Sequence, residues 1–150
     1  MNEPTPGFSV RLADFACPEE AAAAMRIRRI VFIEEQRVSE ALEIDGRDPE
    51  CVHALARDGS GEVIGTARLL PEGKIGRVAV LAPWRNRGVG AALMAVLIAE
   101  ADRRGVEKLK LHAQSWTTGF YERLGFVAEG EEFLEAEIPH RHMKRRRGIS

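Results

Sequence analysis

The chain has 150 residues, of which 45% are hydrophobic and 30% are charged, a composition typical of one globular domain that buries its own core. Its formal net charge of −1 provides no general attraction to nucleic acid or to an acidic membrane, so neither is expected as a partner. Its two cysteines lack CxxC spacing and a surrounding histidine cluster, which argues against a disulfide scaffold and against a metal site.

No segment has the pattern of a secretory leader or approaches the roughly 20 apolar residues needed to span a bilayer. A cytoplasmic protein is therefore expected, with residues 1–150 forming a single domain. Such a chain is compatible with a homodimer.

The first predicted element is a helix that begins near Pro18. Proline is tolerated in a first helical turn, and the two glutamates that follow it suit the positive end of a helix. The alanine run over residues 21–24 has high helix propensity. Met25 and Phe32 lie two turns apart on one face of this helix.

The middle of the chain begins with a polar connection over residues 38–49, which carries the acids Glu40, Glu43, Asp45 and Asp48. The last three of these, together with Glu35, could attract a cationic amine, although exposed loops are commonly acidic. Three strands are predicted next. Residues 52–57 and 63–70 form a hairpin around a glycine-containing turn, and residues 74–81 form the third strand.

Residues 85–90, with the sequence Arg-Asn-Arg-Gly-Val-Gly, separate the third strand from an apolar helix pattern over residues 91–104. A strand, a glycine turn and a helix N-terminus aim several unpaired backbone N–H groups at one point. The helix dipole and the two arginines add positive charge, so the segment predicts an anion site, with pyrophosphate as the expected anion. A lone Gly-x-Gly is more often an ordinary turn, but the flanking elements favour the anion site. No Lys-Ser/Thr pair follows and Leu93 replaces a third glycine, which disfavours a P-loop and a dinucleotide fingerprint.

The two glycines of this segment have different expected roles. Gly88 has no Cβ, so a phosphate oxygen can approach its backbone closely. Gly90 lies inside the first helical turn, where glycine costs roughly 1 kcal/mol relative to alanine. That cost needs a compensating reason, and the close approach of a ligand is one.

The second half of the chain completes an α+β fold. Residues 108–113 alternate as a strand, and the preceding helix makes a βαβ crossover, so this strand and the third are expected to be parallel. A short helix over residues 118–124 ends at Gly125. Residues 126–144 predict a strand hairpin with a long connection through Ile138-Pro139. The expected fold is a mixed, mostly antiparallel sheet with a central βαβ unit and flanking helices.

These motifs resemble the GNAT superfamily of acetyl-CoA-dependent N-acetyltransferases. Arg85, Gly88 and Gly90 match its phosphate-binding pattern, Arg/Gln-x-x-Gly-x-Gly/Ala after a strand. Residues 120–126, Phe-Tyr-Glu-Arg-Leu-Gly-Phe, resemble the family's Tyr-x-x-x-Gly-Phe signature. Gln114 falls where relatives often carry a polar residue that faces the cofactor's arm.

A narrower resemblance is to the ElaA/YjcF-type branch of that superfamily. It rests on residues 27–36, on the acids at positions 43, 45 and 48, and on the stretches 131–133 and 138–143. Because members of this branch mostly lack an established acceptor, this resemblance bears on the fold more than on the substrate.

The resemblance implies a single GNAT-like domain that transfers an acetyl group from acetyl-CoA to a primary amine of a small molecule or peptide. The amine would attack directly in a ternary complex, since neither cysteine lies near the site in sequence. The strand at Val78 to Val80 would diverge from the strand that ends at Ala113 and open a notch for pantetheine. The backbone of Val78 and Val80 would pair with the pantetheine amides, and the N–H of Ala79 or Val80 would polarise the thioester carbonyl. The residues implied in cofactor binding are Val78, Ala79, Val80, Arg85, Asn86, Arg87, Gly88, Val89, Gly90, Ala91, Gln114 and Tyr121.

Tyr121 is the expected acid, because a phenol pKa of about 10 roughly matches that of a leaving thiol, about 8–9. The alternative is a half-buried tyrosine that packs on Phe126. Retention of Tyr121 also argues against the rival function, a catalytically idle acyl-CoA-binding or regulatory domain.

Two residues are the expected candidates for the base. Glu35 would lie at the mouth of the acceptor groove, although it could instead cap the helix or pair with Arg28 or Arg29. His140, like His53, has an intrinsic pKa near 6.5 that suits the role. A lone histidine on a strand is more often structural.

Overall fold

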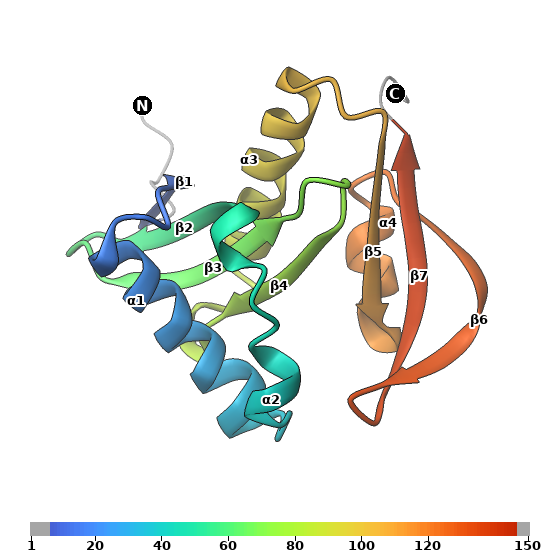
Figure 1. Cartoon of the computed structure of the whole chain (residues 1–150), viewed down its shortest axis with the longest axis horizontal. Helices are drawn as coiled ribbons and strands as arrows, with labels where there is room; N and C mark the ends of the chain where they lie inside the picture. Colours follow the sequence, from blue (N-terminus) through green and yellow to red (C-terminus); the bar gives the residue numbers. More distant parts are fainter. Residues whose placement is uncertain (1–6, 147–150) are drawn as a thin grey trace.

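The computed structural model describes residues 7–146, which form two antiparallel sheets with helices packed on them (Figure 1). Its strands are β1 (Phe8–Ala13), β2 (Val52–Asp58), β3 (Val63–Leu69), β4 (Ile75–Val80), β5 (Lys108–Gln114), β6 (Val127–Glu135) and β7 (Ile138–Arg146). Its α-helices are α1 (Pro18–Arg28), α2 (Glu40–Glu43), α3 (Val89–Arg103) and α4 (Thr118–Glu122). The chain continues α1 as a π-helical segment, Arg29–Glu35, and adds 3-10 turns at Asp48–Glu50, Ala82–Trp84 and Ser115–Thr117.

The two sheets meet where β4 begins, beside the first residues of β5. The first sheet has the order β1-β2-β3-β4 and the second has the order β5-β7-β6. A single parallel bridge joins Lys74 to Lys110, whose backbone N–H donates to the carbonyl of Gly73 at 3.0 Å. Beyond that point the two strands diverge (Figure 1). The α+β fold, the βαβ unit β4-α3-β5 and the divergence are therefore confirmed, although the expected single mixed sheet is split in two.

Helices cover both faces of the first sheet. α3 carries its apolar stripe, with Val89, Leu93 and Leu97, into a core shared with both sheets. α1 packs Ala24 and Ile27 against the opposite face. Within residues 7–146 no helix is long and apolar enough to cross a membrane.

Three local features differ from the sequence-based expectations. β1 was not expected, and its six residues pair with β2 along their whole length. The first helix continues past Phe32 as expected, but residues 29–35 are π-helical and not α-helical. The long connection expected through Ile138 and Pro139 is wrong, because both residues lie in β7. The hairpin turn is instead Ala136-Glu137, with φ values of 52° and 64°, the conformation of a two-residue type I′ turn, which asparagine and glycine normally favour.

Candidate active site

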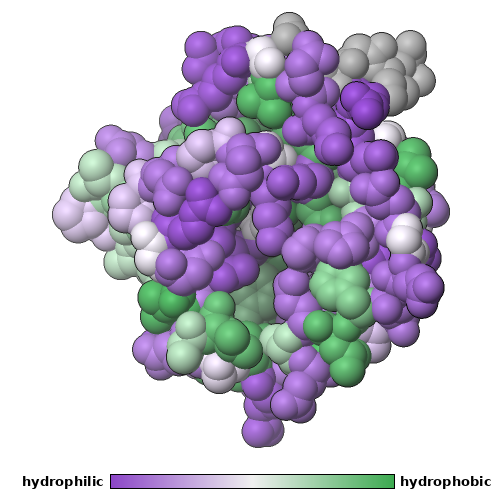
Figure 2. All heavy atoms as spheres, turned by 45° about the vertical axis from the view of Figure 1, so that its right-hand side comes forward, coloured by the Kyte–Doolittle hydropathy of each residue, from purple (hydrophilic) through white to green (hydrophobic). Residues whose placement is uncertain are grey.

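A groove of about 410 Å³ lies between the diverging strands and is closed at its far end by the β6–β7 hairpin. Four residues expected at the site line it: Val78, Gln114, Tyr121 and His140. Figure 2 shows this side of the molecule as a hollow bordered mainly by hydrophilic side chains, with hydrophobic ones gathered along its lower edge. The groove is therefore the place where the chain can enclose a small molecule.

The segment before α3 has the geometry of an anion site. Gly88 is the N-cap residue and adopts φ +89°, which a side chain disfavours. A Cβ added there would meet nothing within 4 Å, so the space beside its backbone is open. No side chain caps α3, so the N–H groups of Val89, Gly90 and Ala91 keep no partner within the helix. The structure therefore offers several backbone donors and a positive helix end at one exposed point.

The two arginines of this segment have different surroundings. The Arg87 guanidinium lies 5.0 Å from the centre of the Trp84 ring, over its face. Arg85 donates from Nε to the carbonyl of Val80 at 2.8 Å and from Nη2 to Glu35 Oε1 at 2.6 Å. Arg85 thus ties the end of β4 to the π-helical segment beside the anion site.

Gly90 has a packing reason that the sequence did not reveal. A Cβ at this position would lie 3.3 Å from Cζ of Phe120, which is tighter than most real contacts. The missing side chain lets α3 approach α4, so helix packing accounts for the glycine without a ligand.

β4 carries a bulge at the expected pantetheine strand. Thr66 pairs with Ala79 and Arg68 pairs with Gly76, so β4 holds one extra residue opposite this stretch of β3. Arg77 adopts φ +53° within the bulge. Val78 faces the groove, whereas the side chain of Ala79 is buried in the core. A bulge disturbs the hydrogen-bond ladder locally, which frees backbone groups of β4 for a ligand.

Gln114 is already hydrogen-bonded inside the groove. Its Nε2 donates to Oε1 of Gln36 at 2.8 Å, and both residues line the groove. The pair links the end of β5 to the segment after α1. Each amide keeps further donor and acceptor capacity for a polar ligand.

Tyr121 lines the groove from α4 and packs edge-to-face with Phe120 and Phe126. Burial raises the pKa of its phenol to about 12. The hydroxyl therefore stays protonated across the physiological range and acts as a donor. The ring packs on Phe126, as the structural interpretation of Tyr121 expected. The side chain also lines the groove, a position that the proposed acid requires.

The expected base candidates lie in different places. Glu35 pairs with Arg85 and not with the local arginines, and it is not among the residues that line the groove. His140 lines the groove, with Nδ1 2.7 Å from the carbonyl of Ile138. His53 lies outside the groove, buried with Nε2 2.9 Å from the carbonyl of Asp48, and stacks on Phe15.

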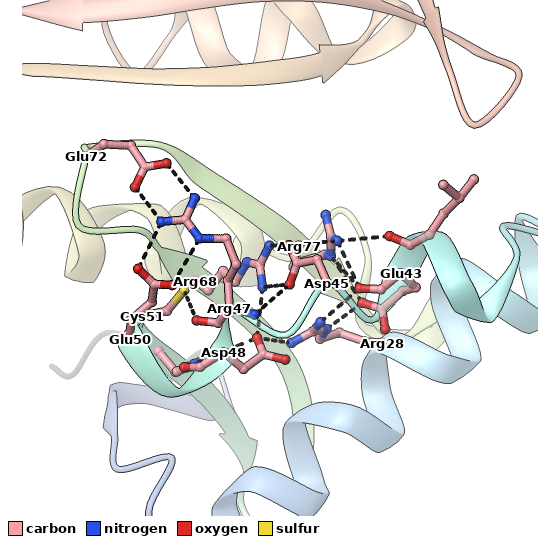
Figure 3. Close-up of polar contacts among 12 residues, drawn as sticks. Arg28, Glu43, Asp45, Arg47, Asp48, Glu50, Cys51, Arg68, Glu72 and Arg77 are labelled. Carbon is pink, nitrogen blue, oxygen red and sulfur yellow. Dashed lines mark hydrogen bonds and ion pairs between the residues drawn. The ribbon is translucent and has the colours of Figure 1, made fainter.

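The acid-rich connection is neutralised by arginines and does not form a free anionic mouth (Figure 3). Arg28 Nε lies 2.7 Å from Glu43 Oε2, and Arg28 Nη1 lies 2.7 Å from Asp48 Oδ1. Arg68 bridges Asp48 and Asp45. Arg77 donates to the carbonyl of Glu43 at 2.9 Å and pairs with the carboxylates of Glu43 and Asp45. Glu43 and Asp48 are buried, and Glu43 and Asp45 line the groove, so the segment forms part of its wall with its acids paired to arginines, contrary to the expectation of acids free to attract a cationic amine.

Two groove residues that contact each other, His112 and Glu135, were not proposed from the sequence. His112 projects from the polar face of β5, two residues before Gln114, and its Nδ1 lies 2.7 Å from Glu135 Oε1 at the end of β6. The alternation of β5 already places His112 and Gln114 on one face, which is a signal that could have found His112. Glu135 had no such signal, because only the hairpin register brings it to the groove.

Comparison with known proteins places this geometry in a family. A model described as an acetyltransferase (GNAT) domain matches residues 19–147. The uncharacterised N-acetyltransferase YjcF of Bacillus subtilis is 35% identical over 129 residues, which cover 83% of this chain and 91% of that protein. An acyl-CoA N-acyltransferase from Pseudomonas aeruginosa superposes with a TM-score of 0.80 at 32% identity, covering 92% of this chain and 99% of the other. ElaA of Escherichia coli superposes with a TM-score of 0.82 at 26% identity and the same coverage.

Proposed function

This chain belongs to the GNAT family of N-acetyltransferases, and from that premise we propose that it transfers the acetyl group of acetyl-CoA to a primary amine by direct attack in a ternary complex. The acceptor would be an amine of a small molecule or peptide. We further propose that the enzyme works in the cytoplasm, as a monomer or a homodimer.

The observations that carry the proposal are the groove between the diverging strands β4 and β5 and the uncapped N-terminus of α3, which follows β4 in the chain. The N–H groups of Val89, Gly90 and Ala91 and the guanidinium groups of Arg85 and Arg87 suit a pyrophosphate. The bulged backbone of β4 would supply amide groups for an extended arm, and Gln114 would add a polar side chain. These residues fit acetyl-CoA, which would supply the activated acetyl group.

The protein would perform three tasks in the proposed acetyl transfer. Tyr121 would donate its proton to the departing thiolate, which suits a phenol that burial keeps protonated. A backbone N–H of Ala79 or Val80 would polarise the thioester carbonyl. The amine would lose its proton on the side of the groove where His140 lies. Proton removal by Glu35 stays a prediction, and the ion pair with Arg85 suggests a second role in positioning that arginine.

The test is acetyl-CoA turnover against a panel of amines, polyamines, amino sugars and peptides, with detection of the free thiol. Acetylated product from one class, together with saturation by both substrates and intersecting kinetics, would support the ternary-complex proposal. Tight acetyl-CoA binding without turnover of any amine would favour the idle acyl-CoA-binding domain instead.

A further inference from the structure

Three of the four histidines of the chain gather on one face of the second sheet, and two of them, His112 and His140, line the groove. His142 stacks on Phe133 with ring centres 4.3 Å apart, and His112 meets Phe133 edge-on at 5.1 Å. His140 lies 5.9 Å from the same ring. Phe133 therefore contacts all three imidazoles, and two of them, those of His112 and His140, approach the carboxylate of Glu135.

Within this cluster, His112 has the closest contact with the carboxylate. His112 Nδ1 lies 2.7 Å from Glu135 Oε1, whereas His140 Nε2 lies 3.9 Å from Glu135 Oε2, beyond a normal hydrogen bond. A carboxylate accepts only, so Nδ1 of His112 carries the proton when the ring is neutral. The lone pair then lies on Nε2, in a residue that lines the groove.

The surroundings of His112 favour its neutral form, which is the form that can accept a proton. Burial lowers its pKa, and Glu135 partly offsets that effect by hydrogen bonding and by charge. The other ionisable groups around it are Lys74 before β4, Lys110 on its own strand, His140 and His142 on β7, and, on the opposite wall of the groove, Glu43, Asp45 and Arg77. Arg77 pairs with both acids of that wall, so their charges are balanced there. Glu135 is the carboxylate that contacts the His112 ring directly.

We propose that His112 is the base that takes a proton from the acceptor ammonium, with Glu135 as its positioning residue. An N–H bond of the ammonium breaks, its electron pair stays on the nitrogen, and the proton binds Nε2 of His112. The imidazolium that forms is stabilised by the Glu135 carboxylate and returns its proton to water after transfer. This inference rests on the proposed acetyl transfer and assigns its proton acceptor.

The experiment measures kcat/KM against pH for the best amine of the panel in wild type and in His112→Gln, Glu135→Gln, His140→Gln and His142→Gln. His112→Gln should lower kcat/KM on the order of 10²-fold and remove the acidic limb of the profile. Glu135→Gln keeps a hydrogen-bond acceptor but loses the charge, so the limb should move to lower pH and the plateau should fall. His142→Gln is the matched control, since His142 touches the same rings but does not line the groove, and it should keep the wild-type limb.

A second substrate separates proton removal from a merely structural role. With an amine that is already neutral at the assay pH, the loss in His112→Gln should shrink to a few-fold, whereas a packing defect would lower the turnover of both amines alike. The assignment to His112 would be overturned if His112→Gln kept the wild-type pH profile of kcat/KM, or if His140→Gln alone lost its acidic limb. Either result would leave the proposed acetyl transfer intact. Failure of the wild type to acetylate any amine would overturn both.

Discussion

Glu35 and Arg85 are joined by an ion pair in which Oε1 and Nη2 lie 2.6 Å apart, across fifty positions of sequence. The same guanidinium donates to the carbonyl of Val80 at the end of β4. One side chain thus connects the π-helical segment, the bulged strand and the turn before α3. The pair stands beside the proposed pyrophosphate site, so its carboxylate and the cofactor would compete for one arginine.

Replacing Glu35 by glutamine tests that competition. The pair is partly exposed and is worth at most about 1 kcal/mol, so Glu35→Gln should tighten acetyl-CoA binding by about two- to fivefold at low salt. The gain should shrink as salt screens the charge. Calorimetry at two ionic strengths measures it, with Glu34→Gln as the exposed neighbouring control. A loss in kcat/KM for the amine on the order of 10²-fold, with unchanged cofactor affinity, would instead support Glu35 as the base.

Gly88→Glu should abolish acetyl-CoA binding, because it places a bulky acid at the open approach to the α3 N-terminus. Gly61→Glu is the matched control, since Gly61 also has a positive φ and open space around it but lies in the β2–β3 turn, outside the proposed anion segment. Both variants carry similar backbone strain, so circular dichroism should show similar melting temperatures. Equal acetyl-CoA affinity for the two variants would contradict the proposed site.

Tyr121→Phe should lower kcat on the order of 10²-fold with little change in acetyl-CoA affinity, since the ring contacts with Phe120 and Phe126 remain. Because burial raises the phenol pKa to about 12, Tyr121 should contribute no alkaline loss of activity below roughly pH 10. Single-turnover kinetics with a reactive amine would check both points. A kcat equal to wild type in a chemistry-limited reaction would exclude the role.

The parts of the fold that could be predicted are those fixed by local pattern. The α3 helix, the alternation of β5 and the turn at Gly88 follow from apolar spacing and glycine chemistry over a few residues. β1 has a weak pattern of its own and becomes a strand through its pairing with β2. The β6–β7 turn uses Ala136 and Glu137, which give no turn signal, because hairpin pairing imposes their positive φ values.

The candidate site divides in the same way. The proposed anion site is one continuous segment, residues 85–91, and its glycine turn and helix start could be predicted from the sequence. The proposed acceptor side combines residues distant in sequence, because His112 and Glu135 meet only through sheet register. The acids of residues 43–48 were misjudged because a sequence does not show which arginines are buried beside them.

The buried network of those acids predicts a strong dependence of stability on one carboxylate. Asp48 contacts both Arg28 and Arg68, and its removal leaves two buried guanidinium groups with fewer partners. Asp48→Asn should therefore lower the free energy of unfolding by about 3–5 kcal/mol, measured by urea denaturation. Glu72→Gln, which removes a surface partner of Arg47, should leave the midpoint almost unchanged.

The pH dependence of the same measurement has a defined sign. Burial raises the pKa of Asp48, but the hydrogen bonds and charges of Arg28 and Arg68 outweigh it and lower the pKa overall. The hydrogen bond from Arg68 likewise lowers the pKa of Asp45. A carboxyl whose pKa is lower in the folded state stabilises the fold above its unfolded pKa, about 3.9, and this contribution is lost as the pH falls through the folded value. The wild type should thus lose stability from about pH 5 downward, and Asp48→Asn should show a shallower slope in that range. An unchanged slope in Asp48→Asn would show that the acid sensitivity arises from other carboxylates.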